Sequence, residues 1–285
     1  MANWLLEPLT YAFMQRGLLA AIVVGIVCAV IGCYVVLRSM AFFGDALAHA
    51  ILPGIAIGYL VGGSARGALF WWALAAAILS SLGIGALNRV ARLREDTAIG
   101  IVFSGMFALG IALISSVRSY AVDLAHFLFG NVLGISPEDL LLIAILGGVV
   151  LLLIIAFYKE FLVLSFDPVL ATTIRIPARA LELLLFVLIA VTVVVSLQTV
   201  GVALMVAMLV TPAATASLVT KRLPAMMLVA AAIAAFSGVA GLYVSFYLSV
   251  ASGAAIVLVC TVVFGLVWLG TTVTGRKGPD RQVDS

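Results

Sequence analysis

The chain has 285 residues, of which 65% are hydrophobic and only 9% are charged, and its formal net charge is +3. Soluble domains contain about 45–50% apolar and about 25% charged residues, so this composition excludes a soluble globular fold. The small net charge and the scattered basic residues also give no argument for nucleic acid as a partner.

Apolar runs of membrane-spanning length follow one another along the whole chain. A spanning helix needs about 20 apolar residues. Runs bounded by charged residues, Pro or Gly predict an all-α, polytopic transmembrane helical bundle, embedded in lipid, with spans at 18–37, 43–62, 68–88, 99–117, 139–158, 180–197, 199–219, 224–245 and 249–272. The long apolar stretch 181–210 could instead form one span, which would make eight.

The basic residues decide between eight and nine spans, because short cytoplasmic loops collect Lys and Arg. With nine spans, twelve of the 15 basic residues lie on one side and three on the other, whereas eight spans divide them seven against eight. The sequence therefore predicts nine spans, with the N-terminus outside and the C-terminus in the cytoplasm. Residues 1–274 are expected to form a single transmembrane domain, and 275–285 a disordered, polar cytoplasmic tail.

Two predicted cytoplasmic segments have features that simple connectors lack. In the segment 165–177, Asp167 can cap a helix N-terminus and Pro168 suits the first helical position, which predicts a short interfacial helix. In the segment 211–224, Pro212 is expected to kink or end the preceding span, and Pro224 to open the next. Both segments are candidates for a docking surface, and plain connectors are the alternative.

One acid–imidazole pair lies within a predicted span. Asp45 and His49 are four residues apart, so their side chains project from one face of a helix. The other 11 of the 12 acidic residues are assigned to loops, tails or helix ends. A carboxylate within the membrane is unfavourable unless it is paired or coordinated, and it marks an ion path by default. The pair is therefore a candidate divalent-metal site, and a structural ion pair is the alternative.

A stripe of small residues runs along the same span and comprises Ala46, Ala50, Gly54, Gly58 and Gly62. Small residues at this spacing allow close helix approach in membranes. One Asp and one His supply half a coordination shell, so two copies that meet near this face would form an N2O2 site suited to Mn, Fe or Zn. Pro53 is expected to kink the helix just beyond His49. Because the span starts near Phe43, the Asp45–His49 pair would lie close to the cytoplasmic end of the span. Either that boundary is therefore wrong, or Ser39–Gly44 is a break in the helix that is buried in the membrane.

Two further groups of residues have weaker signals. Asp123 and His126 form a second acid–imidazole pair on the outer side, for which a loop-stabilising role or an outer metal contact is open. The three cysteines lie in apolar runs, where a thiol acts as a small hydrophobe, and we interpret them as packing residues: Cys28, Cys33 and Cys260.

The segment 39–56 resembles the second-span signature of the manganese/zinc/iron permeases, which are the membrane subunits of metal-importing ABC transporters. Similar blocks follow in the same order at 128–136, 166–168 and 200–216, so the resemblance covers nearly the whole chain. It implies a dimeric, type II importer-like permease of the bacterial cell membrane. Its cargo would be a divalent metal, with manganese favoured over zinc and iron, delivered by an extracytoplasmic metal-binding protein.

The resemblance also implies that a cytoplasmic dimer of ATP-binding cassette ATPases drives the transport. The chain itself has no G-x-x-x-x-G-K-[ST] motif, so it is expected not to be an enzyme. No permanently bound cofactor is expected. The resemblance assigns metal coordination to Asp45 and His49, and it assigns ATPase coupling to Thr211, Pro212, Ala213, Ala214, Thr215, Lys221 and Arg222. A proton- or sodium-coupled secondary transporter is the alternative function.

Overall fold

The computed structural model describes residues 6–63, 66–91, 93–115, 132–166 and 177–273. Every regular element within these ranges is helical, and the helices form nine spans that are long and apolar enough to cross a membrane. These spans are α2 (Ala12–Leu37), the pair α3 (Phe43–Ala50) and α4 (Leu52–Gly62), α5 (Arg66–Val90), α6 (Glu95–Ser115), α8 (Pro137–Ala156), α11 (Ala178–Val200), α12 (Val202–Val219), α13 (Leu223–Leu248) and α14 (Ser252–Val273). The predicted all-α, nine-span bundle is confirmed.

The structure divides the ambiguous stretch 181–210 into two helices at Gly201. This residue has φ 78° and ψ 170°, and its amide donates to the Leu197 carbonyl at 3.0 Å. Only glycine adopts this combination of angles without strain. The chain therefore ends α11 and begins α12 at one residue, and eight spans are ruled out for the described bundle.

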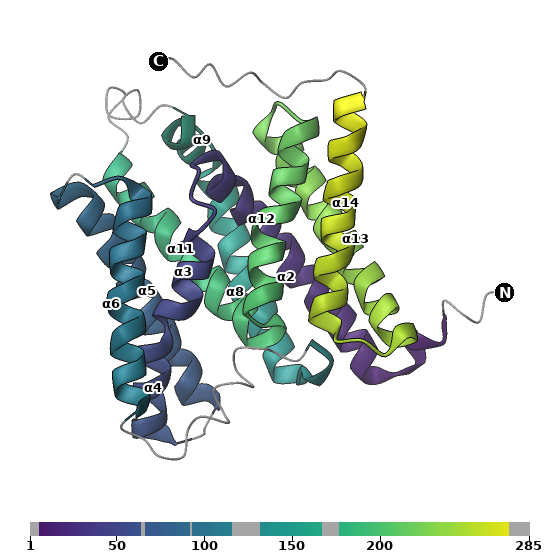
Figure 1. Ribbon diagram of the computed structural model, residues 1–285, viewed down its shortest axis with the longest axis horizontal. Coiled ribbons are helices and arrows are strands. Elements are labelled where there is room, and N and C mark those ends of the chain that lie inside the picture. The colour runs from purple at the N-terminus through teal and green to yellow at the C-terminus, as the bar shows by residue number, and fades with distance from the viewer. Residues whose placement is uncertain (1–5, 64–65, 92, 116–131, 167–176, 274–285) are drawn as a thin grey trace.

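The start of the first span and the end of the last span lie on opposite sides of the bundle. Figure 1 shows α2 starting at its lower end and α14 finishing at its upper end. The short helix α9 (Tyr158–Phe166), which was not predicted, lies at the upper end after α8. The predicted interfacial helix at Asp167 and Pro168 and the predicted tail 275–285 lie outside the described residues.

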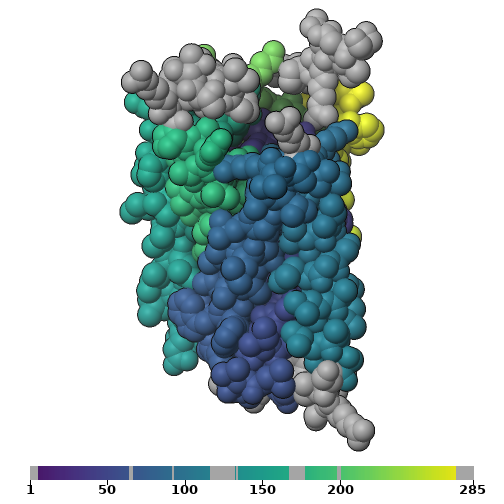
Figure 2. Space-filling model, turned by 90° about the vertical axis from the view of Figure 1, so that its left-hand side faces the viewer, coloured from purple at the N-terminus to yellow at the C-terminus, as the bar shows by residue number. Residues whose placement is uncertain are grey.

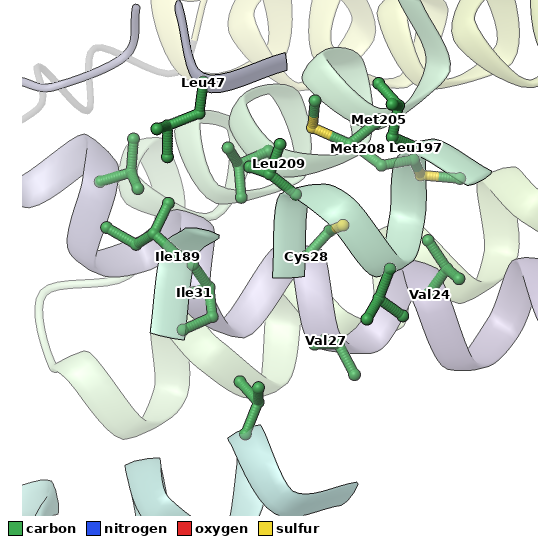
Figure 3. Packing of buried hydrophobic residues seen from close by; sticks show 14 of the residues in the cluster. Val24, Val27, Cys28, Ile31, Leu47, Ile189, Leu197, Met205, Met208 and Leu209 are labelled. Carbon is green, nitrogen blue, oxygen red and sulfur yellow. The ribbon is translucent and has the colours of Figure 1, made fainter. Parts of the chain in front are cut away.

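The centre of the bundle is built on α2, which packs against α8, α11, α12 and α13. Figure 3 shows this packing, in which α2 meets α11 and α12 through apolar side chains; it labels Val24, Val27, Cys28, Ile31, Leu47, Ile189, Leu197, Met205, Met208 and Leu209. All three cysteines are buried here or in α14, as a packing role predicts. Leucines and isoleucines on α8 and α14 instead point outward, where lipid would cover them.

A second group of helices, α4, α5 and α6, forms one face of the molecule. Figure 2 shows α5 and α6 side by side on this face, with α4 emerging between them at the lower end. Helix α3, which precedes α4 in the chain, lies between α6 and the central helices α11 and α12. This arrangement places the predicted metal pair at the junction of the two groups.

Candidate metal site

A short connection brings the chain from α2 to the predicted metal pair. Helix α2 ends at Leu37, Ser39 has a positive φ of 58°, and Met40 is fully buried. Helix α3 begins at Phe43, as predicted. In Figure 1 this connection runs down from the end of α2, and α3 lies toward the middle of the bundle. A break in the helical chain therefore precedes the pair, and the predicted boundary at Phe43 is correct.

The helix that carries the pair is interrupted again just beyond it. Helix α3 ends at Ala50, Ile51 forms a turn, and α4 begins at Leu52 with Pro53 in its first turn. The ring of Pro53 would clash with the His49 carbonyl in a continuous helix, and proline has no amide hydrogen to donate to it. The predicted kink is thus a full break, and it leaves His49 in the last turn of α3.

The structure brings Asp45 and His49 together on one face of α3. The distance from His49 Nδ1 to Asp45 Oδ1 is 3.8 Å, and the same nitrogen lies 2.9 Å from the Asp45 backbone carbonyl oxygen. The side chain of His49 is 29% exposed, and that of Asp45 is 32% exposed. The two groups are therefore half-buried, and each has an open side from which a ligand could approach.

Aromatic rings from α6 line one side of the imidazole. The ring centroids of Phe103 and Phe107 lie 6.0 Å and 5.9 Å from that of His49, both in edge-to-face orientation. Phe42, in the connection before α3, packs edge-on against Phe103 at 6.2 Å. This cluster was not predicted, because spacing along α6 does not reveal which neighbouring helix its aromatic side chains face.

One copy of the chain supplies an incomplete ligand set. Within the part of the chain that the structure describes, no three His, Cys, Asp or Glu side chains are grouped to hold a metal ion. The second predicted pair, Asp123 and His126, lies outside the described residues. Helix α3 thus supplies two ligands of types that bind divalent transition metals, the carboxylate oxygen of Asp45 and an imidazole nitrogen of His49. The other two ligands of a four-ligand shell must come from elsewhere.

The small-residue stripe makes a close helix contact within the chain. A Cβ atom on Gly54 would lie 2.3 Å from the Trp72 carbonyl oxygen, and one on Gly58 would lie 3.1 Å from the Trp72 Cβ. Ala46 and Ala50 are buried as well. The stripe therefore packs inside the chain, with its glycines directly against α5. A meeting of two copies near the metal pair stays a prediction.

The predicted coupling residues lie in two different environments. Helix α12 continues through Pro212 to Val219, so of the two predicted alternatives, a kink or an end of the span, Pro212 does not end it. Thr211 and Ala214 are partly buried, and three residues of the segment are fully buried: Pro212, Ala213 and Thr215. The Thr215 hydroxyl donates to the Thr211 carbonyl at 2.7 Å, so this buried hydroxyl is satisfied within its own helix.

Only the end of this segment is open to solvent or to a partner. Lys221 and Arg222 are exposed in the turn after α12, and α13 begins directly afterwards with Pro224 in its first turn, as predicted. The Thr220 hydroxyl donates to the Ala216 carbonyl at 2.6 Å and closes the end of α12. Any contact with another chain at this position would therefore use the turn more than the buried threonine–proline motif.

A network of charged residues joins the ends of four helices near the connection before α3. Arg38 donates to Glu95 and to Glu182, each at 2.8 Å, and Arg89 also donates to Glu182. The Arg38 guanidinium lies over the ring of Phe186, which in turn packs against Phe43 at 5.1 Å. From the sequence these acids were assigned to loops, tails or helix ends and were not paired. The isolated Glu182 within a long apolar stretch was the available signal.

The comparisons with known proteins agree over nearly the whole chain. A sequence model of the ABC 3 transport family matches residues 10–270. The manganese transport system membrane protein MntC of Halalkalibacterium halodurans is 48% identical over 92% of this chain and 88% of its own. The chelated iron transport system membrane protein YfeD of Yersinia pestis is 40% identical over 90% of this chain and 85% of its own.

A solved structure supports the same conclusion. PsaBC from Streptococcus pneumoniae, in complex with Fab, superposes with a TM-score of 0.81 at 38% identity, over 94% of this chain and 95% of that chain. Together with the nine apolar helices, these relatives make the chain a multi-pass protein of the bacterial cell membrane. By sequence and by fold, the chain belongs to the ABC 3 transport family.

Proposed function

We propose that this chain is the permease subunit of an ABC transporter that imports a divalent transition metal, with manganese as the favoured cargo and zinc and iron as the alternatives. The family membership supports the transporter class. The names of two relatives, one for manganese and one for chelated iron, support a metal cargo. A carboxylate with an imidazole does not select manganese by affinity, because zinc binds nitrogen and oxygen ligands more tightly.

The observation that carries the proposal is the geometry of Asp45 and His49. Both side chains leave the same face of α3, are about one-third exposed, and are separated by 3.8 Å at their nearest oxygen and nitrogen. The cargo metal would be held between them during passage. A second permease copy that contributes the same two side chains would complete an N2O2 shell, so we propose a homodimer that meets at the open side of this pair.

Transport is driven by other chains in this proposal. The sequence has no phosphate-binding loop, so ATP hydrolysis is assigned to a dimer of cytoplasmic ATP-binding cassette subunits, and the permease itself is not an enzyme. An extracytoplasmic binding protein delivers the metal. The exposed cations Lys221 and Arg222 would contact the ATPase, and the buried residues from Thr211 to Thr215 would transmit its motion along α12.

The site assignment is tested by uptake of radioactive manganese into cells that produce the complete transporter. Asp45→Ala and His49→Ala should each abolish uptake while the amount of protein in the membrane stays normal. Asp96→Ala is the matched control, because this acid is exposed in the first turn of α6 and should leave uptake unchanged. Normal uptake by either α3 variant would remove that residue from the site.

The energy source and the cargo are tested in reconstituted vesicles. Omission of the ATPase subunits should stop uptake, whereas a proton- or sodium-coupled carrier would continue to work alone. Competition of zinc and iron against labelled manganese then ranks the cargoes. For the coupling surface, Lys221→Cys should form crosslinks to the ATPase, and a lack of crosslinks from the whole turn would count against this contact.

A further inference from the structure

We infer that His49 offers its Nε2 atom to the cargo metal, and that Phe103 and Phe107 are positioning residues that hold the imidazole in this orientation. This inference rests on the proposed function of Asp45 and His49 as the metal pair. It adds to that function the identity of the ligand atom and two residues of α6.

The hydrogen bond of the imidazole fixes its tautomer. His49 Nδ1 lies 2.9 Å from the Asp45 backbone carbonyl oxygen, and a carbonyl oxygen can only accept a hydrogen bond. Nδ1 therefore carries the hydrogen in the neutral ring, which leaves the lone pair on Nε2 free to bind a metal. Metal-binding histidines in proteins commonly donate their second ring N–H to a carbonyl in this way, and the bond increases the basicity of the ligand atom.

The same geometry leaves the Asp45 carboxylate available. Its Oδ1 atom is 3.8 Å from His49 Nδ1, which is longer than a hydrogen bond between these atoms. The imidazole is thus held by the backbone of residue 45 and not by its side chain. Both side chains of the pair therefore keep a ligand atom for the metal.

Two phenylalanine rings of α6 restrain the imidazole from outside α3. Phe103 meets it at an interplanar angle of 86° and Phe107 at 68°, with both centroids within 6.0 Å. The two phenyl rings also stack on each other at 5.7 Å, so they form one block. A half-turn of the imidazole about its χ2 angle would exchange the positions of Nδ1 and Cδ2 and break the hydrogen bond to the Asp45 carbonyl, which would leave the tautomer unfixed. The aromatic block opposes that rotation on one side of the ring.

Close helix packing holds the aromatic block against the pair. A Cβ atom on Gly110 of α6 would lie 2.5 Å from the Leu52 Cβ and 3.1 Å from the Pro53 ring. Helix α6 therefore touches the chain at the break that ends α3. The contacts of Phe103 and Phe107 lie on one side of this break, and the contact of Gly110 lies on the other, so α6 bridges it.

The inference predicts a specific defect when the phenyl rings are removed. In the double variant Phe103→Leu/Phe107→Leu, the imidazole should sample both orientations, and the KM for manganese should rise about 10-fold with a similar maximal rate. Loss of a group that orients a metal ligand typically weakens metal binding by about 10–100-fold. Phe236→Leu on α13 is the matched control, because this phenylalanine is exposed on the outer surface.

The decisive measurement is nitrogen NMR of the full-length chain in lipid bilayers, with 15N-labelled histidine and Zn²⁺ as the probe, at a pH well above the ordinary titration range of imidazole. The chain has two histidines, so the His126→Gln background leaves only the signals of His49. Without metal, we expect one tautomer with the hydrogen on Nδ1. Zn²⁺ should then shift the Nε2 signal, and the double phenylalanine variant should show both tautomers.

The outcomes separate this inference from the proposed function. If neither ring nitrogen responds to Zn²⁺, the metal pair itself is wrong, and the inference is overturned with it. If Zn²⁺ shifts the Nδ1 signal, or if the unsubstituted protein shows a mixture of tautomers, the metal pair stands and the inference is overturned. A single Nδ1–H tautomer in the double variant would overturn the positioning role of the two phenylalanines.

Discussion

The guanidinium of Arg38 donates a 2.8 Å hydrogen bond to the carboxylate of Glu182, although 144 positions separate them in the chain. The same group binds Glu95 at 2.8 Å, and the Arg38 side chain is only 9% exposed. Arg89 pairs with the second oxygen of Glu182. Two arginines and two glutamates thus neutralise each other where α2, α5, α6 and α11 meet, directly before the connection that leads to α3.

Removal of Arg38 should destabilise the bundle. In Arg38→Met, Glu95 loses its partner and Glu182 keeps only Arg89, in a part of the protein where both carboxylates are mostly buried. The free energy of unfolding should fall by about 2–4 kcal/mol, measured by denaturant titration in bicelles, because an uncompensated buried charge is unfavourable. The second substitution Glu95→Gln should restore part of this loss. Arg94→Met, at an exposed arginine, is the control; an equal effect from it would contradict this account.

The network illustrates where prediction from sequence stops. The nine spans follow from apolar run lengths and from the sidedness of basic residues, both of which are local or additive properties. Glu95 and Glu182 were assigned only to the group of acids in loops, tails or helix ends, and their pairing with Arg38 depends on which helices are neighbours. Spacing along one chain carries no information on that point. The same gap applies to Gly54 and Gly58, whose small size was recognised while their partner helix α5 was not.

Gly44 should be sensitive to the addition of a single methyl group. A Cβ atom there would lie 2.5 Å from Leu209 Cδ2, so Gly44→Ala forces the leucine side chain to move. We expect a loss of about 1–3 kcal/mol in the free energy of unfolding, as for other overpacked cores. Because Gly44 precedes Asp45, manganese uptake should fall as well.

A double-mutant cycle tests whether the contact with Leu209 is the cause. Leu209→Ala alone should cost about 2–5 kcal/mol, because it leaves a cavity between α3 and α12. The double variant should be more stable than the sum of the two single effects, since the new methyl group enters that cavity. Gly105→Ala on α6 is the control, because a Cβ atom there has no neighbour within 4 Å. Additive effects would mean that Gly44 acts through another contact.

Gly201 should tolerate no side chain. Its φ of 78° and ψ of 170° lie in a region that only glycine populates without strain. Gly201→Ala is therefore expected to lower the free energy of unfolding by about 1–3 kcal/mol, measured by the same titration. Gly148→Ala, at an open position within α8, should be neutral or slightly stabilising. If both variants behave alike, backbone strain does not explain the boundary between α11 and α12.

The site itself was predictable only in part. Asp45 and His49 could be paired from sequence because helical periodicity relates residues four apart on one element. Phe103 and Phe107 could not be assigned, because they belong to α6 and their meeting with His49 depends on packing at Gly110 and Pro53. The depth of the pair also depends on the break after α2, which is caused by a turn at Ser39 with a positive φ that is unusual for serine.

The predicted orientation can be tested with single cysteines. The three native cysteines are buried, so their replacement by Ala gives a background with little labelling. Val250, between α13 and α14, and Lys221, between α12 and α13, are both exposed and lie at opposite ends of α13. A membrane-impermeant maleimide should label Val250→Cys in intact cells and Lys221→Cys only after permeabilisation, because the basic turn is expected in the cytoplasm. The reverse pattern would invert the bundle, and it would move Lys221 and Arg222 away from any cytoplasmic ATPase.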